Sequence, residues 1–360
     1  MNRPAPATRG RSKLLSALVG SALLIGVVVM LIGFSVASPL FLTPNNLRQI
    51  LLEGSVLALV AAPLTILVLM GMIDLSVGSM LGVGGVVAGE LMVRFHVNPL
   101  LAVLVAVAVG VLIGLANGTL VGFLRWSPIV VTLGMLTALR GVAQVIAPQT
   151  PNGFPAGFGS LGAGYVLGIP APLFFGAGAF VVAAVFLYRT PWGRHAYAIG
   201  VNREAAFLSG VAVRRLPMIA FAVTGGAAAL GGVLDAARLD AAPGGTLGVG
   251  FELTVLTAVL LGGVAFEGGR GTLFGAVLGV LFLVILQNGL TLLNVQNYYQ
   301  DIANGLALVV AAALNFAAER QGTAGGLTAL LDLVRDRQVR PAAPQAENTP
   351  IPAEDGLVTK

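Results

Sequence analysis

Cysteine is absent from this sequence of 360 residues, and charged residues make up only 10% of it. Without cysteine the chain can form neither a disulfide nor a thiolate metal site. Soluble domains carry about a quarter charged residues, so this composition excludes an ordinary soluble domain. The only two lysines, Lys13 and Lys360, do not stand in the Gly-Lys-Ser/Thr sequence that a P-loop requires. Any nucleotide-driven step would therefore need a separate chain.

Apolar sequence is what the chain has in abundance, with 57% hydrophobic residues and a mean hydropathy of +0.93. A helix needs roughly 20 apolar residues to cross a bilayer. The first long apolar run follows the basic start "MNRPAPATRGRSK" and exceeds the roughly 7 to 15 residues of a signal peptide's apolar region, so we interpret it as an uncleaved span. The predicted spans are 14–37, 50–70, 77–94, 99–123, 128–147, 171–188, 216–236, 252–266, 271–293 and 299–317.

The basic residues indicate how these spans are oriented. If the N-terminus is cytoplasmic, only Arg48, Arg94 and Arg238 fall in external segments, and Arg140 falls inside a span. All other lysines and arginines are then internal, as the positive-inside rule requires. The pI near 10.1 therefore reflects membrane orientation, and we expect no nucleic-acid partner.

The predicted organisation is an all-α, polytopic membrane protein with both termini cytoplasmic. Residues 1–13 form a basic cytoplasmic segment, and residues 14–317 form the transmembrane domain. Residues 318–360 form a cytoplasmic tail that is expected to be largely disordered, because it is rich in proline, alanine and charge.

Two stretches far apart in the sequence resemble each other. "DLSVGSMLGVGG" at 74–85 aligns without a gap on "ELTVLTAVLLGG" at 252–263, and each opens a predicted span, the third and the eighth. An offset of five spans inverts one copy across the membrane, which predicts two inverted halves of five helices, a common plan in transporters. Chance similarity between Gly/Val-rich helices is the alternative.

The predicted cytoplasmic loop 189–215 holds five arginines and one acid. Its segment "NREAAFLSG" suits a short helix capped by Asn202. A solvated, positive-inside loop explains the arginines but leaves the Ala-Ala-Phe-Leu face uncovered. The segment therefore favours docking of a short helix into a groove on a cytoplasmic partner.

The segments "GMIDLSVGS", "PIVVTLGMLTALRG", "GRHAYAIGVNREAAFLSGV" and "FELTVLTAVLLGGVAFEGGRGTLFGAVLG" occur in one order along the chain. Together they resemble the permease subunits of bacterial ribose/xylose-type ABC importers. The resemblance implies a multi-pass protein of the cytoplasmic membrane that carries a monosaccharide by alternating access. Relatives often have Ser and Lys in place of Glu267 and Arg270, a departure to which we attach no substrate meaning.

The resemblance also implies partners. These are a second permease subunit, identical or closely related, a cytoplasmic ATPase with tandem nucleotide-binding domains, and an extracytoplasmic sugar-binding protein. ATP and Mg would bind to the ATPase, and no cofactor is expected on this chain, which is not itself an enzyme. The ATPase-coupling residues implied are Gly193, Arg194, Asn202, Glu204, Ala205, Ala206 and Gly210.

Other transport classes stay open at this point. An ABC permease for nucleosides or branched-chain amino acids would share the mechanism. An ion-coupled carrier working alone would usually bury several acids, and Glu53, Asp74, Glu90 and Glu252 are available for that. A channel fits the hydropathy, but the docking-like loop argues against it.

Acids at the repeated motif are candidates for the translocation pathway, each followed by a hydroxyl residue. Asp74, with Ser76, either caps the start of the third span or lines the path. Glu252, with Thr254, is a less usual cap and is expected near the external face, at an outer gate or a docking surface.

The remaining pathway candidates lie inside spans. Arg140 is too deep to reach the membrane surface comfortably, so it should pair with a carboxylate or with backbone carbonyls, and Gln144 lies one turn away. Asn117, Gln287 and Asn288 either bond neighbouring helices together or offer weak contacts to a neutral, polyhydroxylated solute.

Overall fold

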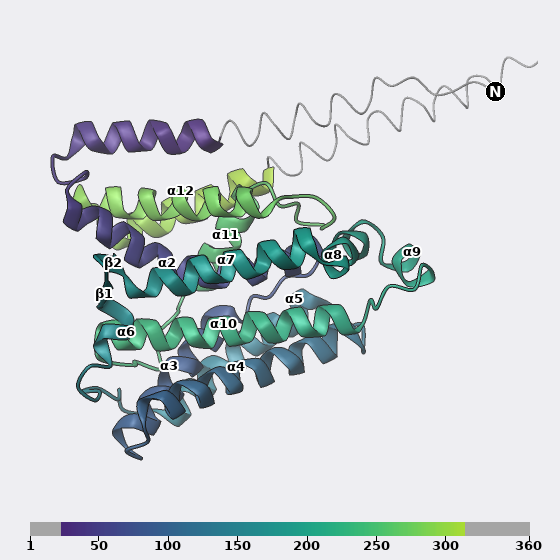
Figure 1. Cartoon of the computed structure of the whole chain (residues 1–360), viewed down its shortest axis with the longest axis horizontal. Helices are drawn as coiled ribbons and strands as arrows, with labels where there is room; N and C mark the ends of the chain where they lie inside the picture. The colour runs from purple at the N-terminus through teal and green to yellow at the C-terminus, as the bar shows by residue number, and fades with distance from the viewer. Residues whose placement is uncertain (1–22, 314–360) are drawn as a thin grey trace, which may run out of the picture. The chain divides into compact units, whose positions relative to one another are not determined.

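The structure, a computed structural model, describes residues 23–313 (Figure 1). Within these residues, each predicted span contains a helix. The predicted basic segment 1–13, the first part of the first span and the predicted tail 318–360 lie outside the described residues. Six of the helices are long and apolar enough to cross a bilayer, namely α2, α4, α5, α7, α10 and α12. The helices at the predicted spans are Leu23–Ala37, α2 (Pro44–Leu69), α3 (Val77–Val93), α4 (Pro99–Gly122), α5 (Pro128–Ile146), α7 (Ala171–Arg189), α10 (Arg215–Leu239), α11 (Phe251–Leu261), α12 (Leu273–Leu292) and 297–313.

Local sequence explains where several of these helices begin. Pro44, Pro99 and Pro128 each occupy the first helical position, where a missing backbone N–H leaves no donor unsatisfied. The side chains of Thr43 and Asn98 accept hydrogen bonds from the first turns of α2 and α4. These caps fix the N-terminal ends of both helices.

The long loop before α7 departs from the all-α prediction. It contains a short helix, α6 (Gly159–Ala163), and a two-stranded antiparallel hairpin of β1 (Tyr165–Val166) and β2 (Ile169–Pro170). Leu167 and Gly168 both have positive φ, at 53° and 80°, as a tight hairpin turn requires. The expected Pro/Gly-rich loop is therefore a small ordered structure.

Helix α10 packs against α2, α3 and α4 through small residues. A Cβ atom on Gly110 of α4 would collide with the carbonyl oxygen of Gly225 of α10, and the reverse substitution would collide in the same way. Gly85 of α3 lies similarly against Gly232. Such glycines let membrane helices approach with their backbones almost in contact.

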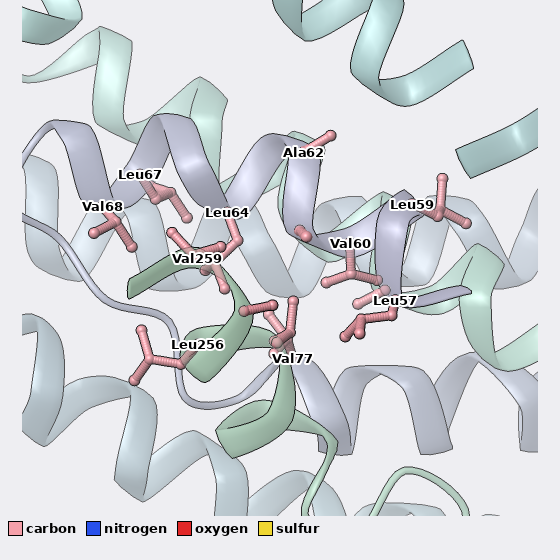
Figure 2. Close-up of a cluster of buried hydrophobic side chains, with 14 of the residues drawn as sticks. Leu57, Leu59, Val60, Ala62, Leu64, Leu67, Val68, Val77, Leu256 and Val259 are labelled. Atoms are coloured by element: carbon pink, nitrogen blue, oxygen red, sulfur yellow. The ribbon is translucent and has the colours of Figure 1, made fainter. Parts of the chain in front are cut away.

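Helix α2 contacts α11 and α12 in addition to α10. Figure 2 shows α2 side chains, among them Leu64 and Val60, meeting Val77 at the start of α3 and Leu256 and Val259 of α11. All five side chains are buried. Helix α2 therefore joins the starts of α3 and α11 into one apolar core.

Candidate functional site

Two non-helical segments interrupt the bundle, and most of the predicted pathway residues lie beside them. The first break, residues 70–76, joins α2 to α3, and the second break, residues 240–250, joins α10 to α11. Protein buries part of each segment, because Asp74 and Ser76 of the first break and Ala242 and Leu247 of the second are buried. Both segments are therefore candidate functional sites.

A chain of buried polar groups holds the first break. The Oδ1 atom of Asp74 accepts hydrogen bonds from the backbone N–H of Ser76 at 2.9 Å and from its hydroxyl at 2.5 Å. Asn117 of α4 donates to the Ser76 hydroxyl at 2.9 Å. All three residues are at most 1% exposed. This contact favours the interpretation that they position the helix, and a pathway role stays a prediction.

Asp74 is not the N-cap that the sequence suggests. The N-cap of α3 is Ser76, and the Asp74 carboxylate bonds the backbone of Ser76 itself, two residues ahead, as in an Asx turn. Within the described chain, Oδ2 of Asp74 and Oδ1 of Asn117 have no hydrogen-bond partner. The acid therefore shapes the turn before the helix.

The second break runs back along α3. A Cβ atom on Gly89 would lie 3.3 Å from Cβ of Ala242, and one on Gly82 would lie 2.9 Å from the carbonyl oxygen of Leu247. Gly78, in the first turn of α3, faces Gly248. Helix α11 has only 11 residues, about 16 Å, which is roughly half of the hydrocarbon thickness. The helix alone is therefore too short for the crossing that the sequence predicts here.

Glu252 lies against the start of α3. It stands in the first turn of α11, and a Cβ atom on Gly78 would collide with its Oε2 atom. The second break thus brings the start of α11 to the start of α3, and the expected position of Glu252 near the external face stays a prediction. Oε2 is buried and has no hydrogen-bond partner among the described residues.

Arg140 holds the second break from α5, as the prediction of a carbonyl partner requires. Its Nη1 atom donates to the carbonyl oxygen of Leu247 at 2.6 Å, and its charge interacts with that of Glu252. Gln144, one turn along α5, is exposed and faces Gly245. Thr254 is partly exposed and donates to the carbonyl of Gly250 at 3.3 Å. Four predicted residues thus gather at this break.

The last two pathway candidates lie apart, on α12. Asn288 is 4% exposed and exchanges two amide hydrogen bonds, of 2.9 and 3.0 Å, with Asn46 of α2. Sequence reasoning did not select Asn46, although a buried amide close to a helix start was a usable signal. Gln287 is partly exposed beside it. Interhelix bonding is therefore what Asn288 does in the structure.

The predicted cytoplasmic loop forms two helices, α8 (Pro191–Val201) and α9 (Arg203–Leu208), and α9 projects away from the bundle (Figure 1). The prediction that Asn202 caps α9 is confirmed, because its side chain accepts from the backbone N–H of Glu204 at 3.0 Å and of Ala205 at 2.9 Å. Glu204 and Ala205 are exposed, while Ala206 is buried.

An exposed apolar surface remains on α9. Phe207 is 52% and Leu208 is 81% exposed. Gly210 ends the helix with φ of 80°, and the N–H groups of Gly210 and Val211 bond the carbonyls of Phe207 and Ala206, which is a Schellman motif. The helix is fixed at both ends and presents an uncovered face.

Helix α8 ties this surface to the bundle. Gly193 is buried against the end of α7, and Arg194 is exposed. The Tyr197 hydroxyl donates to the carbonyl of Gly271 at 3.0 Å, and Gly269 N–H donates to the carbonyl of Leu69 at 2.8 Å. The loop after α11 thus contacts both α8 and the residue before the first break.

Arg203 is a residue that sequence reasoning missed. Its Nη2 atom donates to the carbonyl of Gly122, at the end of α4, at 3.0 Å, and to that of Val213 at 3.3 Å. A cation at the C-terminus of a helix satisfies carbonyls that have no intrahelical partner. Arg203 therefore anchors α9 to α4 and to the start of α10.

The described residues offer no metal site in place of the two breaks, and a groove between α7 and α12 is apolar. Between residues 23 and 313, no group of three or more His, Asp or Glu side chains is arranged to hold a metal ion. A shallow groove of about 290 Å³ between α7 and α12 is lined by apolar and aromatic side chains such as Phe180 and Phe274. It offers a polar solute little to bind.

The amino-acid sequence matches one family of known proteins. The family model described as branched-chain amino acid transport system / permease component matches residues 46–314. The ribose import permease protein of Escherichia coli (strain K12) is 39% identical over 293 residues, which cover 80% of this chain and 91% of that protein. The chain belongs to this permease family.

Further members of the permease family are similar over comparable lengths. The D-allose transport system permease protein of Escherichia coli (strain K12) is 36% identical over 301 residues, covering 82% of this chain and 90% of that protein. The L-arabinose ABC transporter permease protein of Azospirillum brasilense is 35% identical, with coverage of 79% and 85%. The resemblance drawn from the sequence is confirmed. No match was found among the solved structures.

Proposed function

We propose that the chain is the membrane-spanning permease subunit of an ABC importer that carries a monosaccharide across the bacterial inner membrane. The names of three similar permeases, for ribose, D-allose and L-arabinose, support a sugar of this size. ATP and Mg bind to a cytoplasmic ATPase subunit with tandem nucleotide-binding domains. A second permease subunit and an extracytoplasmic sugar-binding protein complete the importer.

The helix packing supports ten crossings in two inverted halves, with both termini cytoplasmic. Helix α10, the second span of the later half, packs on α3 and α4 of the earlier half. Helix α2, the second span of the earlier half, packs in turn on α11 and α12. This exchange of partners is what a twofold axis in the membrane plane produces.

The second break is the best candidate for part of the sugar pathway. Arg140, Gln144, Glu252 and Thr254 all retain some exposure there, whereas Asp74, Ser76 and Asn117 do not. A neutral sugar passes through a site that offers several weak hydrogen bonds without holding it tightly. The first break then sets the position of α3 against which the second break moves.

The exposed face of α9 is the proposed ATPase contact. Glu204, Ala205, Phe207 and Leu208 are exposed on it, and α8 connects it to the loop that touches Leu69. A rigid displacement of α8 and α9 would therefore reach the first break through the hydrogen bonds of Tyr197 and Gly269, and the second break through α11, which connects it to this loop. This connection carries the proposal that ATP hydrolysis on the partner drives alternating access.

The test is sugar uptake by the complete importer in proteoliposomes, with ATP supplied to the ATPase side. Glu204→Arg should abolish uptake while the permease stays in the membrane, because it reverses a charge on the docking face. Arg189→Glu, which reverses an exposed charge outside α9, is the control and should transport normally. Normal uptake by Glu204→Arg would remove the docking role.

Two further arms separate the alternatives. Dissipating the proton gradient while ATP is maintained should leave uptake intact; an immediate collapse would identify an ion-coupled carrier. The description of the matching family favours branched-chain amino acids as the second candidate cargo. Leucine or a nucleoside in excess should not compete with ribose, and effective competition would change the assigned cargo.

A further inference from the structure

Three arginines from separate segments meet where α4 leaves the bilayer. Arg125 follows the end of α4, Arg203 begins α9, and Arg214 directly precedes α10. The Arg203 guanidinium bonds the carbonyls of Gly122 and Val213, which brings the other two segments to it. We refer to Arg125, Arg203 and Arg214 as the arginine cluster.

The cluster carries positive charge without a matching acid. Burial lowers the pKa of Arg203, and the charges of Arg125 and Arg214 lower that pKa further. Among residues 23–313, the ion pairs present are Arg94–Glu90 and Arg238–Asp235, and neither involves the cluster. Like charges held together in this way favour an anion from outside the chain.

The position of the cluster indicates which anion. Most of α4 is not buried by the rest of the protein, and its mean hydropathy of 2.7 suits contact with lipid. Leu124 and Trp126, on either side of Arg125, are 55% and 57% exposed. Exposed tryptophan is typical of the headgroup level of a bilayer. The cluster therefore lies at the membrane boundary, beside the phosphates of the cytoplasmic leaflet.

The backbone conformation of Arg125 is also unusual. Its φ is 60°, a left-handed conformation in which glycine is favoured over residues with a Cβ atom. An arginine therefore occupies this turn despite conformational strain.

We propose that Arg125, Arg203 and Arg214 bind the phosphate of an anionic phospholipid in the cytoplasmic leaflet. Guanidinium groups match phosphate oxygens with paired hydrogen bonds. Arg203 keeps its two carbonyl contacts and supplies further N–H donors, because a guanidinium has five. The lipid then neutralises the cluster next to the anchor of α9.

The experiment measures phosphatidylglycerol bound to the purified full-length permease by native mass spectrometry, with phosphatidylcholine as the neutral comparison. The variant Arg125→Gln/Arg214→Gln removes two charges and leaves the Arg203 anchor in place. The control Arg189→Gln/Arg194→Gln removes two exposed charges from the same predicted side of the membrane. Melting temperatures of both variants confirm that they are folded.

The proposal expects roughly thirtyfold weaker phosphatidylglycerol binding by the cluster variant, from two lost arginine contacts. The control should bind like the wild type, and phosphatidylcholine binding should not change. Equal phosphatidylglycerol binding by both variants would overturn the site. So would full displacement of the lipid by millimolar inorganic phosphate, which would identify a free-anion site.

A third arm excludes a protein partner. Association with the ATPase subunit is measured in nanodiscs of phosphatidylcholine alone. The cluster variant should associate there as the wild type does. Weakened association, together with unchanged lipid binding, would make the cluster a protein-docking surface and refute the lipid assignment. This outcome is independent of the sugar transport test above.

Discussion

Arg140 and Asp74 are both ionisable residues inside the bundle, and they make different kinds of contact. Asp74 is enclosed with Ser76 and Asn117, and its hydrogen bonds shape the backbone turn before α3. Arg140 instead spans the space between two elements and bonds the carbonyl of Leu247. A charged donor to a carbonyl contributes about 1.5 to 3 kcal/mol, which helps to hold a segment that lies outside the regular helices.

We therefore expect Arg140→Met to loosen the second break. Losing the bond to Leu247 should speed hydrogen exchange of the amides in 244–250 by roughly 10- to 100-fold, measured by mass spectrometry. Arg140→Lys should recover part of the protection, because an ammonium can still donate to the carbonyl. Arg189→Met, an exposed position, serves as the control. Unchanged exchange in Arg140→Met would show that other contacts hold the segment.

At the scale of elements, the ends of helices were more predictable than the neighbours of their side chains. The capping of α9 by Asn202 follows from short-range chemistry, and the sequence indicates it directly. The position of Glu252 beside Gly78 does not, because it depends on how far residues 240–250 extend along α3. The pairing of Asn288 with Asn46 also depends on tertiary packing, since 242 residues separate them.

The C-terminal end of α9 gives a prediction at this scale. Gly210→Ala places a Cβ atom on a left-handed residue, which costs about 1 kcal/mol and weakens the Schellman motif. The ATPase should then bind roughly fivefold more weakly in a titration of the reconstituted complex. Gly178→Ala is the control, because a Cβ atom there has no neighbour within 4 Å. Equal loss of affinity in both variants would contradict the local explanation.

For the whole molecule, the hydropathy and the arginine distribution were sufficient to predict where helices form, and every predicted span contains one. They could not indicate that α11 is only 11 residues long, because its apolar flank continues into the loop after it. The pattern also gave no sign of the hairpin of β1 and β2, whose turn depends on the φ angles of two residues.

The absence of cysteine makes the topology testable in an otherwise unchanged chain. Single cysteines at His96 and Val166 should react with a membrane-impermeant maleimide on intact cells lacking an outer membrane. Cysteines at Trp126 and Ser209 should react only after lysis. All four positions are exposed, so access rather than burial determines labelling. Labelling of Ser209→Cys on intact cells would invert the proposed orientation.

The second break also constrains how the protein is made. An 11-residue apolar helix is too short to enter a bilayer as an independent span. Residues 240–250 expose backbone groups that lipid cannot satisfy, and α3 supplies the surface that covers them. In the proposed ten-span topology, we therefore expect this segment to enter the membrane only once the earlier half of the chain has assembled. Packing would then set the order of membrane insertion together with the order of translation.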